Sequence, residues 1–160
     1  MTTIELQTVI MAPMEICFDL SRSIDLHQFT TKKTGEKAID GRTSGLIEKD
    51  EWVKWRATHF GVRQTLTVKI TEMERPKFFR DVMLKGAFRS MSHDHLFEPH
   101  ERGTLMTDRF YYQVPFWIAG KLFNSVILKP YMANFLRERN DIIREIAESD
   151  RWKEYLPPQA

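Results

Sequence analysis

The first part of the chain predicts one strand followed by two short helices. Hydrophobic and polar residues alternate over residues 2–11, which is the two-residue period of a half-buried strand. The spacing then becomes helical over residues 13–21, where Pro13 suits the first turn. Ser23 suits the N-cap of a second short helix over residues 24–29.

The middle of the chain predicts one weak strand and five long ones. Turn residues gather between Thr30 and Ile47, and the short apolar pair Ala38-Ile39 within them indicates the weak strand. The long alternating runs follow, separated by short turns with glycine or proline: 51–60, 62–73, 77–84, 88–97 and 104–114. Strands joined by such turns form an antiparallel meander.

The last third of the chain changes to the period of a long helix. From Phe116 to about Ser149, hydrophobic residues recur every three to four positions, which predicts a helix of roughly 30 residues. We expect the charges of Arg137, Glu138 and Arg139 to lie on its solvated face.

The order of these elements predicts an α+β fold, because the strands come in one run and no βαβ units alternate. A curved antiparallel sheet of about six to seven strands would wrap around the C-terminal helix, with the two short helices after the first strand. A sheet that curls beyond what the helix can fill leaves a cavity. We expect a single domain over residues 1–160, with its core at about 3–149 and a loose tail at 150–160.

The composition excludes several classes of protein. A chain of 160 residues with 42% hydrophobic and 29% charged residues fits a folded domain rather than a disordered chain or a coiled-coil rod. A net charge of +2 without a run of like charges argues against nucleic acid as a partner. Cys17 is the only cysteine, which excludes an intramolecular disulfide and a CxxC metal knuckle and favours a reducing compartment.

The chain carries no sign of a targeting or membrane segment. Residues 1–12 lack the features of a signal peptide, and no stretch approaches the roughly 18 apolar residues of a membrane span. We therefore expect a cytoplasmic protein without an integral membrane segment, and no pattern predicts its oligomeric state. Aromatic residues, at 12%, are the unusual part of the composition, and they can line a cavity as well as fill a core.

Turn length decides which residues of the first long hairpin face inward. A two-residue turn at Phe60-Gly61 pairs Trp55 with Leu66 and His59 with Val62. The alternation then gives the inner face of both strands: Val53, Trp55, Ala57, His59, Val62, Gln64, Leu66, Val68 and Ile70.

The last hairpin of the meander is expected to turn at residues 99–103 and to pair Phe97 with Thr104, which sets His95 opposite Met106. The same register gives the remaining inward-facing residues: His93 opposite Asp108, Met91 opposite Phe110, and Tyr112 beyond them. A dry core seldom carries so many polar groups, because each unpartnered one costs roughly 1–3 kcal/mol. Either these groups satisfy one another or a cavity holds water or a ligand.

Several segments of the chain resemble one known superfamily and together cover about residues 3–148. They are Ile10–Phe18, Val53–Gly61, Phe79–Phe88, His93–Glu98, Gly103–Asp108 and Tyr131–Asn140. The chain is similar to the START-related, Bet v 1-like proteins, also called SRPBCC or polyketide cyclase/dehydrase-like proteins. The resemblance implies the helix-grip fold. The superfamily includes transporters, cyclases, hydrolase-like enzymes and hormone receptors, so the fold alone does not choose the function.

The third long strand can face either way. A two-residue turn before it would point Val82 and Leu84 inward, whereas a three-residue turn would point Phe79, Asp81 and Met83 inward. The pattern of the superfamily favours the second arrangement.

The resemblance implies that a small hydrophobic or amphipathic molecule binds between the sheet and the last helix, because such pockets are mostly apolar with a few placed polar groups. The side chains expected around the ligand are Trp55, His59, Gln64, Leu66, Met83, Met91, His93, His95, Phe97, Met106, Asp108, Phe110, Tyr112, Met132 and Leu136. A non-catalytic regulatory or interaction module, which would use Trp52 and Trp117 on its surface, is an alternative from another class.

The inner face also offers groups for chemistry. His59, Asp81, His93, His95 and Asp108 could serve as the general acid–base groups of a cyclase- or hydratase-like enzyme. No GxSxG motif accompanies them. The His-x-His spacing also permits metal ligation. We prefer histidine–aspartate pairs that tie strands together, and we expect no metal and no cofactor.

Overall fold

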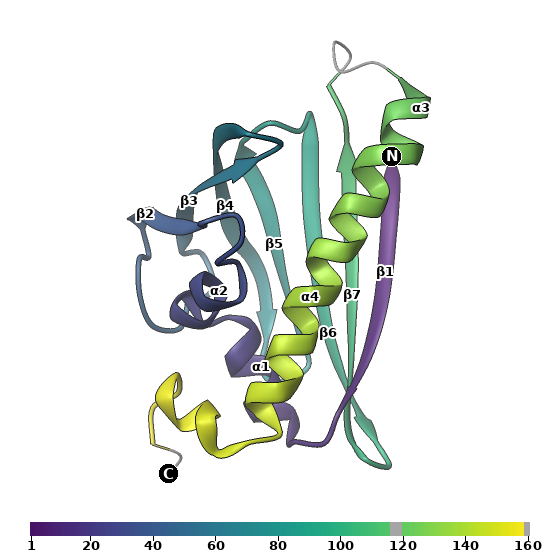
Figure 1. The fold of residues 1–160 in the computed structure, drawn as a ribbon. Helices are drawn as coiled ribbons and strands as arrows, with labels where there is room; N and C mark the ends of the chain where they lie inside the picture. Colours follow the sequence, from purple (N-terminus) through teal and green to yellow (C-terminus); the bar gives the residue numbers. More distant parts are fainter. Residues whose placement is uncertain (116–119, 159–160) are drawn as a thin grey trace.

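The computed structural model describes residues 1–115 and 120–158 and contains a seven-stranded antiparallel sheet with a long C-terminal helix (Figure 1). The strands are β1 (Thr2–Ile10), β2 (Lys37–Gly41), β3 (Trp52–His59), β4 (Val62–Glu74), β5 (Phe78–Lys85), β6 (Ser90–His100) and β7 (Gly103–Gln113). The helices are α1 (Met14–Ser21), α2 (Ile24–Thr30), α3 (Lys121–Phe123), a π-helical turn (Asn124–Leu128), α4 (Lys129–Ala147) and a 3₁₀ helix (Asp150–Glu154). The predicted α+β helix-grip architecture is confirmed.

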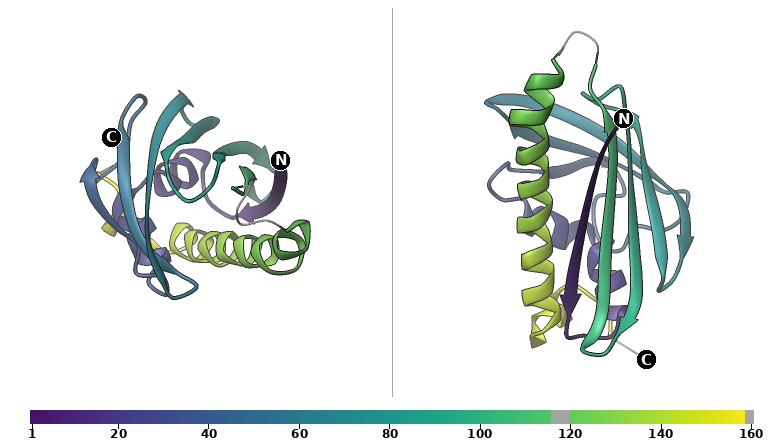
Figure 2. Two further views of the ribbon diagram at one scale, coloured as in Figure 1. Left: turned by 90° about the horizontal axis from the view of Figure 1, so that it is seen from above. Right: turned by 90° about the vertical axis from the view of Figure 1, so that its right-hand side faces the viewer.

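The sheet curves around one side of α4. Its strand order is β1-β7-β6-β5-β4-β3-β2, so the meander from β2 to β7 is completed by β1 at the β7 edge. Seen from above, the sheet curls and α4 lies across its open side (Figure 2). The helix packs against β1, α1 and α2. In residues 1–115 and 120–158, no helix is long and apolar enough to cross a membrane. The predicted surface residue Trp117 falls outside the described residues.

The first long hairpin has the predicted register. Trp55 lies opposite Leu66 and His59 opposite Val62. Phe60 and Gly61 form the two-residue turn with positive φ angles of 52° and 73°, the backbone conformation that two-residue hairpin turns require. Val53, Trp55 and Ala57 are buried on the inner face.

The predicted register of the β6–β7 hairpin is wrong by two residues. Phe97 lies opposite Met106 rather than Thr104, and His95 lies opposite Asp108. The strands continue to His100 and Gly103, so only two residues remain for the turn. A shift of two preserves the face on which each side chain lies, and the inward set is therefore unchanged.

The lower part of the sheet holds an aromatic core. Glu74 pairs with Phe78, which leaves a three-residue turn and points Phe79 inward, as the superfamily pattern favours. Phe18 of α1 packs edge-on against both Phe79 and Phe97, with ring centroids 5.3 and 5.4 Å away. Helix α1 thus fills this end of the sheet.

The C-terminal segment is ordered against the core, and the prediction of a loose tail is wrong for its first part. Ser149 caps the 3₁₀ helix Asp150–Glu154 by accepting a hydrogen bond from the next turn. Trp152 and Tyr155 pack against the core, and Leu156 is only 6% exposed. Trp152, Tyr155 and Leu156 do have helical spacing, but the segment is too short for its period to predict a helix.

Truncating Leu156 tests this packing. Leu156→Ala should lower the free energy of unfolding by about 2–3 kcal/mol, because a buried leucine loses its contacts and leaves a cavity. Urea denaturation measures the effect. The control Lys153→Ala, at a side chain that is 61% exposed, should change stability by less than about 0.5 kcal/mol. Equal, negligible effects of both substitutions would mean that the tail is loose in solution.

Candidate functional site

A cavity of about 280 Å³ lies between the inner face of the sheet and α4. Its wall is mostly apolar and includes ten of the predicted ligand-binding side chains. These are Trp55, His59, Gln64, Leu66, Met91, His93, His95, Phe110, Met132 and Leu136. Asp81, predicted as a catalytic candidate, lines the same cavity.

The other five predicted side chains do not border the cavity: Met83, Phe97, Met106, Asp108 and Tyr112. Three of them are covered by helices. Phe97 lies against Phe18 of α1, Met106 accepts a contact from the Ser21 hydroxyl, and Asp108 is closed off by α4. The remaining two, Tyr112 and Met83, pack against neighbouring residues of the same end of the sheet.

Tyr112 lies near the end of β7, and Met83 lies near the end of β5. The Tyr112 hydroxyl donates a hydrogen bond to Asn124 at 2.7 Å, and its ring packs against Phe88. The Met83 side chain approaches Gly86 closely, where a Cβ would meet its sulfur. Strand alternation places these side chains on the right face but carries no information on which helix covers them.

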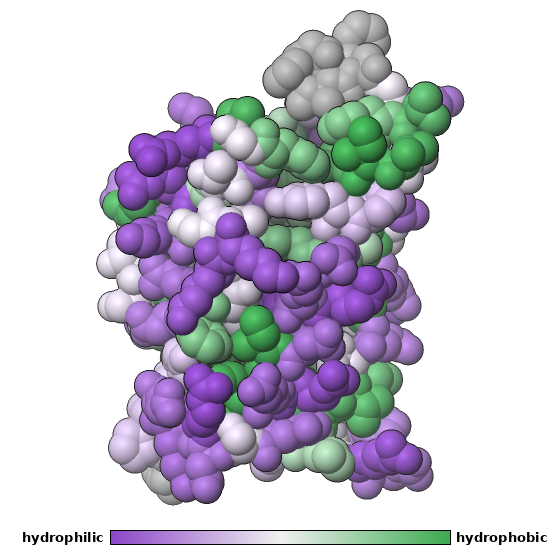
Figure 3. Space-filling view, viewed as in Figure 1, coloured by the Kyte–Doolittle hydropathy of each residue, from purple (hydrophilic) through white to green (hydrophobic). Residues whose placement is uncertain are grey.

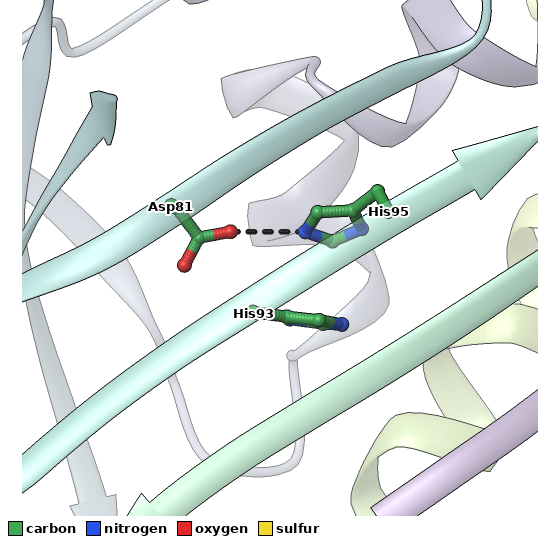
Figure 4. Close-up of side chains that lie close together, drawn as sticks. All are labelled: Asp81, His93 and His95. Carbon is green, nitrogen blue, oxygen red and sulfur yellow. Dashed lines mark hydrogen bonds and ion pairs between the residues drawn. The ribbon is translucent and has the colours of Figure 1, made fainter. Parts of the chain in front are cut away.

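The first polar cluster of the site, here called the His–Asp network, joins three strands to α4. It consists of Asp81 on β5, His93 and His95 on β6, Asp108 on β7, and Arg139 and Asn140 on α4. Figure 4 shows the rings of His93 and His95 side by side, with Asp81 bonded to His95.

Asp108 is the centre of the network. One of its oxygens, Oδ1, accepts a hydrogen bond from Nε2 of His93 at 2.7 Å and lies 3.2 Å from Nδ1 of His95. The other oxygen, Oδ2, accepts a hydrogen bond from the Asn140 amide at 2.6 Å, and the Arg139 guanidinium lies 3.6 Å from Oδ1. The carboxylate is fully buried, so its charge is balanced entirely by these protein groups.

His95 lies between two carboxylates. Its Nε2 is 2.9 Å from Asp81, and its ring stacks on Phe79 at 4.1 Å. The contact of Nδ1 with Asp108 is ionic rather than a well-directed hydrogen bond. Burial alone would lower the pKa of His95, but the two carboxylates outweigh it and raise the pKa above its usual value.

His93 has the opposite tendency. Burial lowers its pKa first, and the neighbouring charge of His95 lowers it further. Although burial would raise the pKa of Asp108, the hydrogen bond from His93 and the adjacent His95 hold that pKa well below 3.8. The surroundings therefore favour the charged form of His95 and the neutral form of His93. Since Nε2 of His93 donates to Asp108, its Nδ1 keeps a lone pair at the cavity wall.

A second polar cluster, the Glu36 cluster, borders the cavity from the other side. Glu36 precedes β2 and bonds to Nε2 of His27 at 2.9 Å, and His59 bonds to the Tyr131 hydroxyl of α4 at 2.7 Å. Burial would raise the pKa of Glu36, but the charge of His27 lowers it. Burial lowers the pKa of His59. The His27 ring also packs on Trp55 at 4.2 Å.

Sequence analysis missed several of these residues. Arg139, expected on the solvated face, is only 5% exposed and lines the cavity. The helical period could have found it, because Leu136, Arg139 and Ile143 are spaced along one face. Glu36 and His27 lie in a loop and a short helix, where no period marks an inward side chain.

Two further kinds of chemistry can be judged from the geometry. Ligand atoms of Asp81, His93 and His95 lie within 4.8 Å of one another and could together hold a metal ion. A metal ion held there would replace the hydrogen bond between His95 and Asp81. The expectation of no metal stays a prediction. Burial raises the pKa of Cys17 to about 11, which keeps its thiol protonated and unreactive.

The two histidines should titrate on opposite sides of 6.5, their ordinary pKa. The contribution of His95 to the free energy of unfolding is complete below pH 6.5. It is lost as the pH rises through the raised pKa of His95 in the folded state. Asp108 contributes above its ordinary pKa of 3.8 and loses its contribution as the pH falls through its lowered pKa. Two-dimensional NMR of the imidazole C–H groups checks the prediction, with His93→Gln and His95→Gln for assignment.

Removal of the Asp108 charge supplies the control for this titration. Asp108→Asn should lower the pKa of His95, because the anion beside its Nδ1 is lost. Titration of both histidines on the same side of 6.5 in the unmodified protein would contradict the charge assignment.

Comparisons with known proteins support the fold. No family model matches the chain, and no curated protein matches it. The chain is similar to the solved structure of protein CV1439 from Chromobacterium violaceum, with a TM-score of 0.69, 13% identity, and coverage of 94% of this chain and 100% of that one.

Two further solved structures are similar to the chain. Ginseng major latex-like protein 151 from Panax ginseng has a TM-score of 0.68 at 14% identity, over 92% of this chain and 98% of that one. Ara h 8.0201 has a TM-score of 0.59 at 12% identity, over 89% and 97%. The protein described here has the helix-grip fold of the Bet v 1-like proteins.

Proposed function

We propose that the chain binds one small amphipathic molecule in the cavity between the sheet and α4. The observation that carries the proposal is an apolar cavity with a polar cluster on each side. Its volume of about 280 Å³ is near the lower end of the roughly 300–1,000 Å³ of ligand pockets. The cavity therefore suits a compact ligand with an apolar body.

The charges around the cavity favour a neutral ligand. In the His–Asp network, Asp81 and Asp108 are balanced by His95 and Arg139. A charged group of the ligand would be buried in this apolar cavity without a counterion, and burial of an unpaired charge costs free energy. A ligand hydroxyl can instead donate a hydrogen bond to Nδ1 of His93, and a ligand carbonyl can accept one from the Gln64 amide.

Filling the cavity tests the proposal. Ala57 is buried and lines the cavity, so Ala57→Trp should place an indole in the ligand volume and weaken binding at least about tenfold. The probe is the neutral apolar dye N-phenyl-naphthylamine, titrated by fluorescence, with a stoichiometry near one in the unmodified protein. The matched control is Thr58→Trp, because Thr58 is exposed on the other face of the same strand.

The control should leave both binding and the thermal unfolding midpoint close to those of the unmodified protein. Native mass spectrometry of the freshly purified protein should also show a bound small molecule that is absent from Ala57→Trp. If the unmodified protein binds neither the dye nor any member of a broad set of lipids, aromatics and polyketides, the proposal is wrong.

A cyclase- or hydratase-like enzyme is the second candidate function, and the state of His93 favours it. A neutral histidine whose Nε2 is held by a buried aspartate and whose Nδ1 has a lone pair at a cavity is arranged as a general base. The enzyme would use the same cavity as the ligand-binding protein.

His93→Gln separates the two candidates. If the protein is an enzyme, turnover of a carbonyl compound extracted from the cavity should fall about a hundredfold or more, while its binding stays within about twofold. Mass spectrometry of the incubated compound measures turnover. An unmodified protein that returns the compound unchanged would eliminate the enzyme.

A further inference from the structure

One end of the molecule, here called the mouth end, carries exposed cations and no acidic residues. It is formed by the β3–β4 turn, the β5–β6 turn, α3 and the first residues of the π-helical turn and α4 (Figure 1). The sequence contains no aspartate or glutamate in residues 60–71, 82–93 or 109–137. The exposed cations at the ends of these elements are Arg63, Lys85, Arg89, Lys121 and Lys129.

These cations are available to an external partner. Within residues 1–115 and 120–158, no ion pair involves any of the five. They come from β4, β5, the β5–β6 turn, α3 and α4, so their clustering is a property of the fold rather than of a charged run in the chain.

The mouth end also exposes large apolar side chains. They are Phe60, Val62, Leu84, Leu122, Val126 and Ile127, with exposed fractions from 46% to 76%. Figure 3 shows the hydrophobic surface over α3 and the π-helical turn at the upper end of the molecule. Large apolar side chains exposed together at one end of a molecule are typical of an interaction site.

The cavity opens within this surface. Phe60 and Ala87 line the cavity and are exposed, so the cavity reaches solvent between the two turns. Phe60 packs against Tyr131 at 4.5 Å and faces Phe123 at 6.5 Å across the opening. A partner that covers the apolar rim would also cover the opening.

We infer that the mouth end docks on the surface of an anionic lipid bilayer. Apolar side chains flanked by cations are the chemistry of interfacial membrane binding, since the side chains enter the boundary between headgroups and acyl chains while the cations meet anionic headgroups. A second copy of this chain fits less well, because two copies joined at this end would bring their cations together. The docking does not require that the cavity hold a ligand.

Vesicle flotation tests the inference. The full chain should float with phosphatidylcholine vesicles in which about a third of the lipid is phosphatidylglycerol, and not with phosphatidylcholine alone. Because each cation that meets an anionic surface raises affinity roughly fivefold, Lys121→Glu with Lys129→Glu should weaken binding at least tenfold. Raised salt should weaken binding in the same direction.

Two further variants isolate the surface. Leu122→Ser with Val126→Ser should also reduce flotation, without loss of folding because both side chains are exposed. The matched control is Lys77→Glu with Arg102→Glu, which makes the same charge change in the β4–β5 and β6–β7 turns at the opposite end of the sheet. It should retain at least half of the affinity. Circular dichroism confirms that each variant is folded.

The outcomes are distinct from those of the ligand test. Dye binding by the Lys121→Glu, Lys129→Glu variant should be unchanged, so a loss of flotation with intact dye binding supports the docking surface alone. Equal flotation with neutral and anionic vesicles, equal loss in both charge variants, or no flotation at all would overturn the inference. So would concentration-dependent self-association without lipid that Leu122→Ser with Val126→Ser abolishes, because the occupant would then be a second copy.

Discussion

Asp108 carries a charge in a place where water cannot solvate it, and the geometry around the cavity follows from how that charge is balanced. It sits on β7, fully buried, with His93 and His95 of the neighbouring strand and Asn140 of α4 bonded or paired to it. Removal of one partner from a buried ion pair costs about 3–5 kcal/mol, because the remaining charge is left alone. The helix and the sheet are therefore held at one register relative to each other at this point.

The cavity exists because the two ends of the sheet are filled differently. Below the network, Phe18 of α1 packs edge-on against both Phe79 and Phe97 and fills this end of the sheet. The cavity lies toward Phe60 and Phe88, where α4, His27 of α2 and Glu36 face the inner side of the sheet. The His–Asp network lies at the boundary between these parts, so it is both the floor of the cavity and the attachment of the helix.

Sequence analysis predicted the elements and registers that depend on hydrophobic period and turn length. It failed for residues whose position depends on contacts between elements that are distant in the chain. The hairpin at Phe60-Gly61 was predicted to the residue, because a two-residue turn leaves one register. The β6–β7 register was wrong because Pro99 and His100 pair in the strand although their types suggest a turn. The inward position of Arg139 follows from the helical period, but its charge obscured that assignment until Asp108 supplied a partner.

The overall charge of the chain conceals its distribution. A net charge of +2 is too small to indicate a charged partner, yet the mouth end carries five exposed cations and no acid over residues 60–71, 82–93 and 109–137. The remainder of the chain must then carry more acids than bases, which gives the molecule a positive pole at the opening of its cavity. Such a pole orients the protein toward a negative surface before any contact forms. The same opening would admit a ligand, so the fold combines orientation and access at one end.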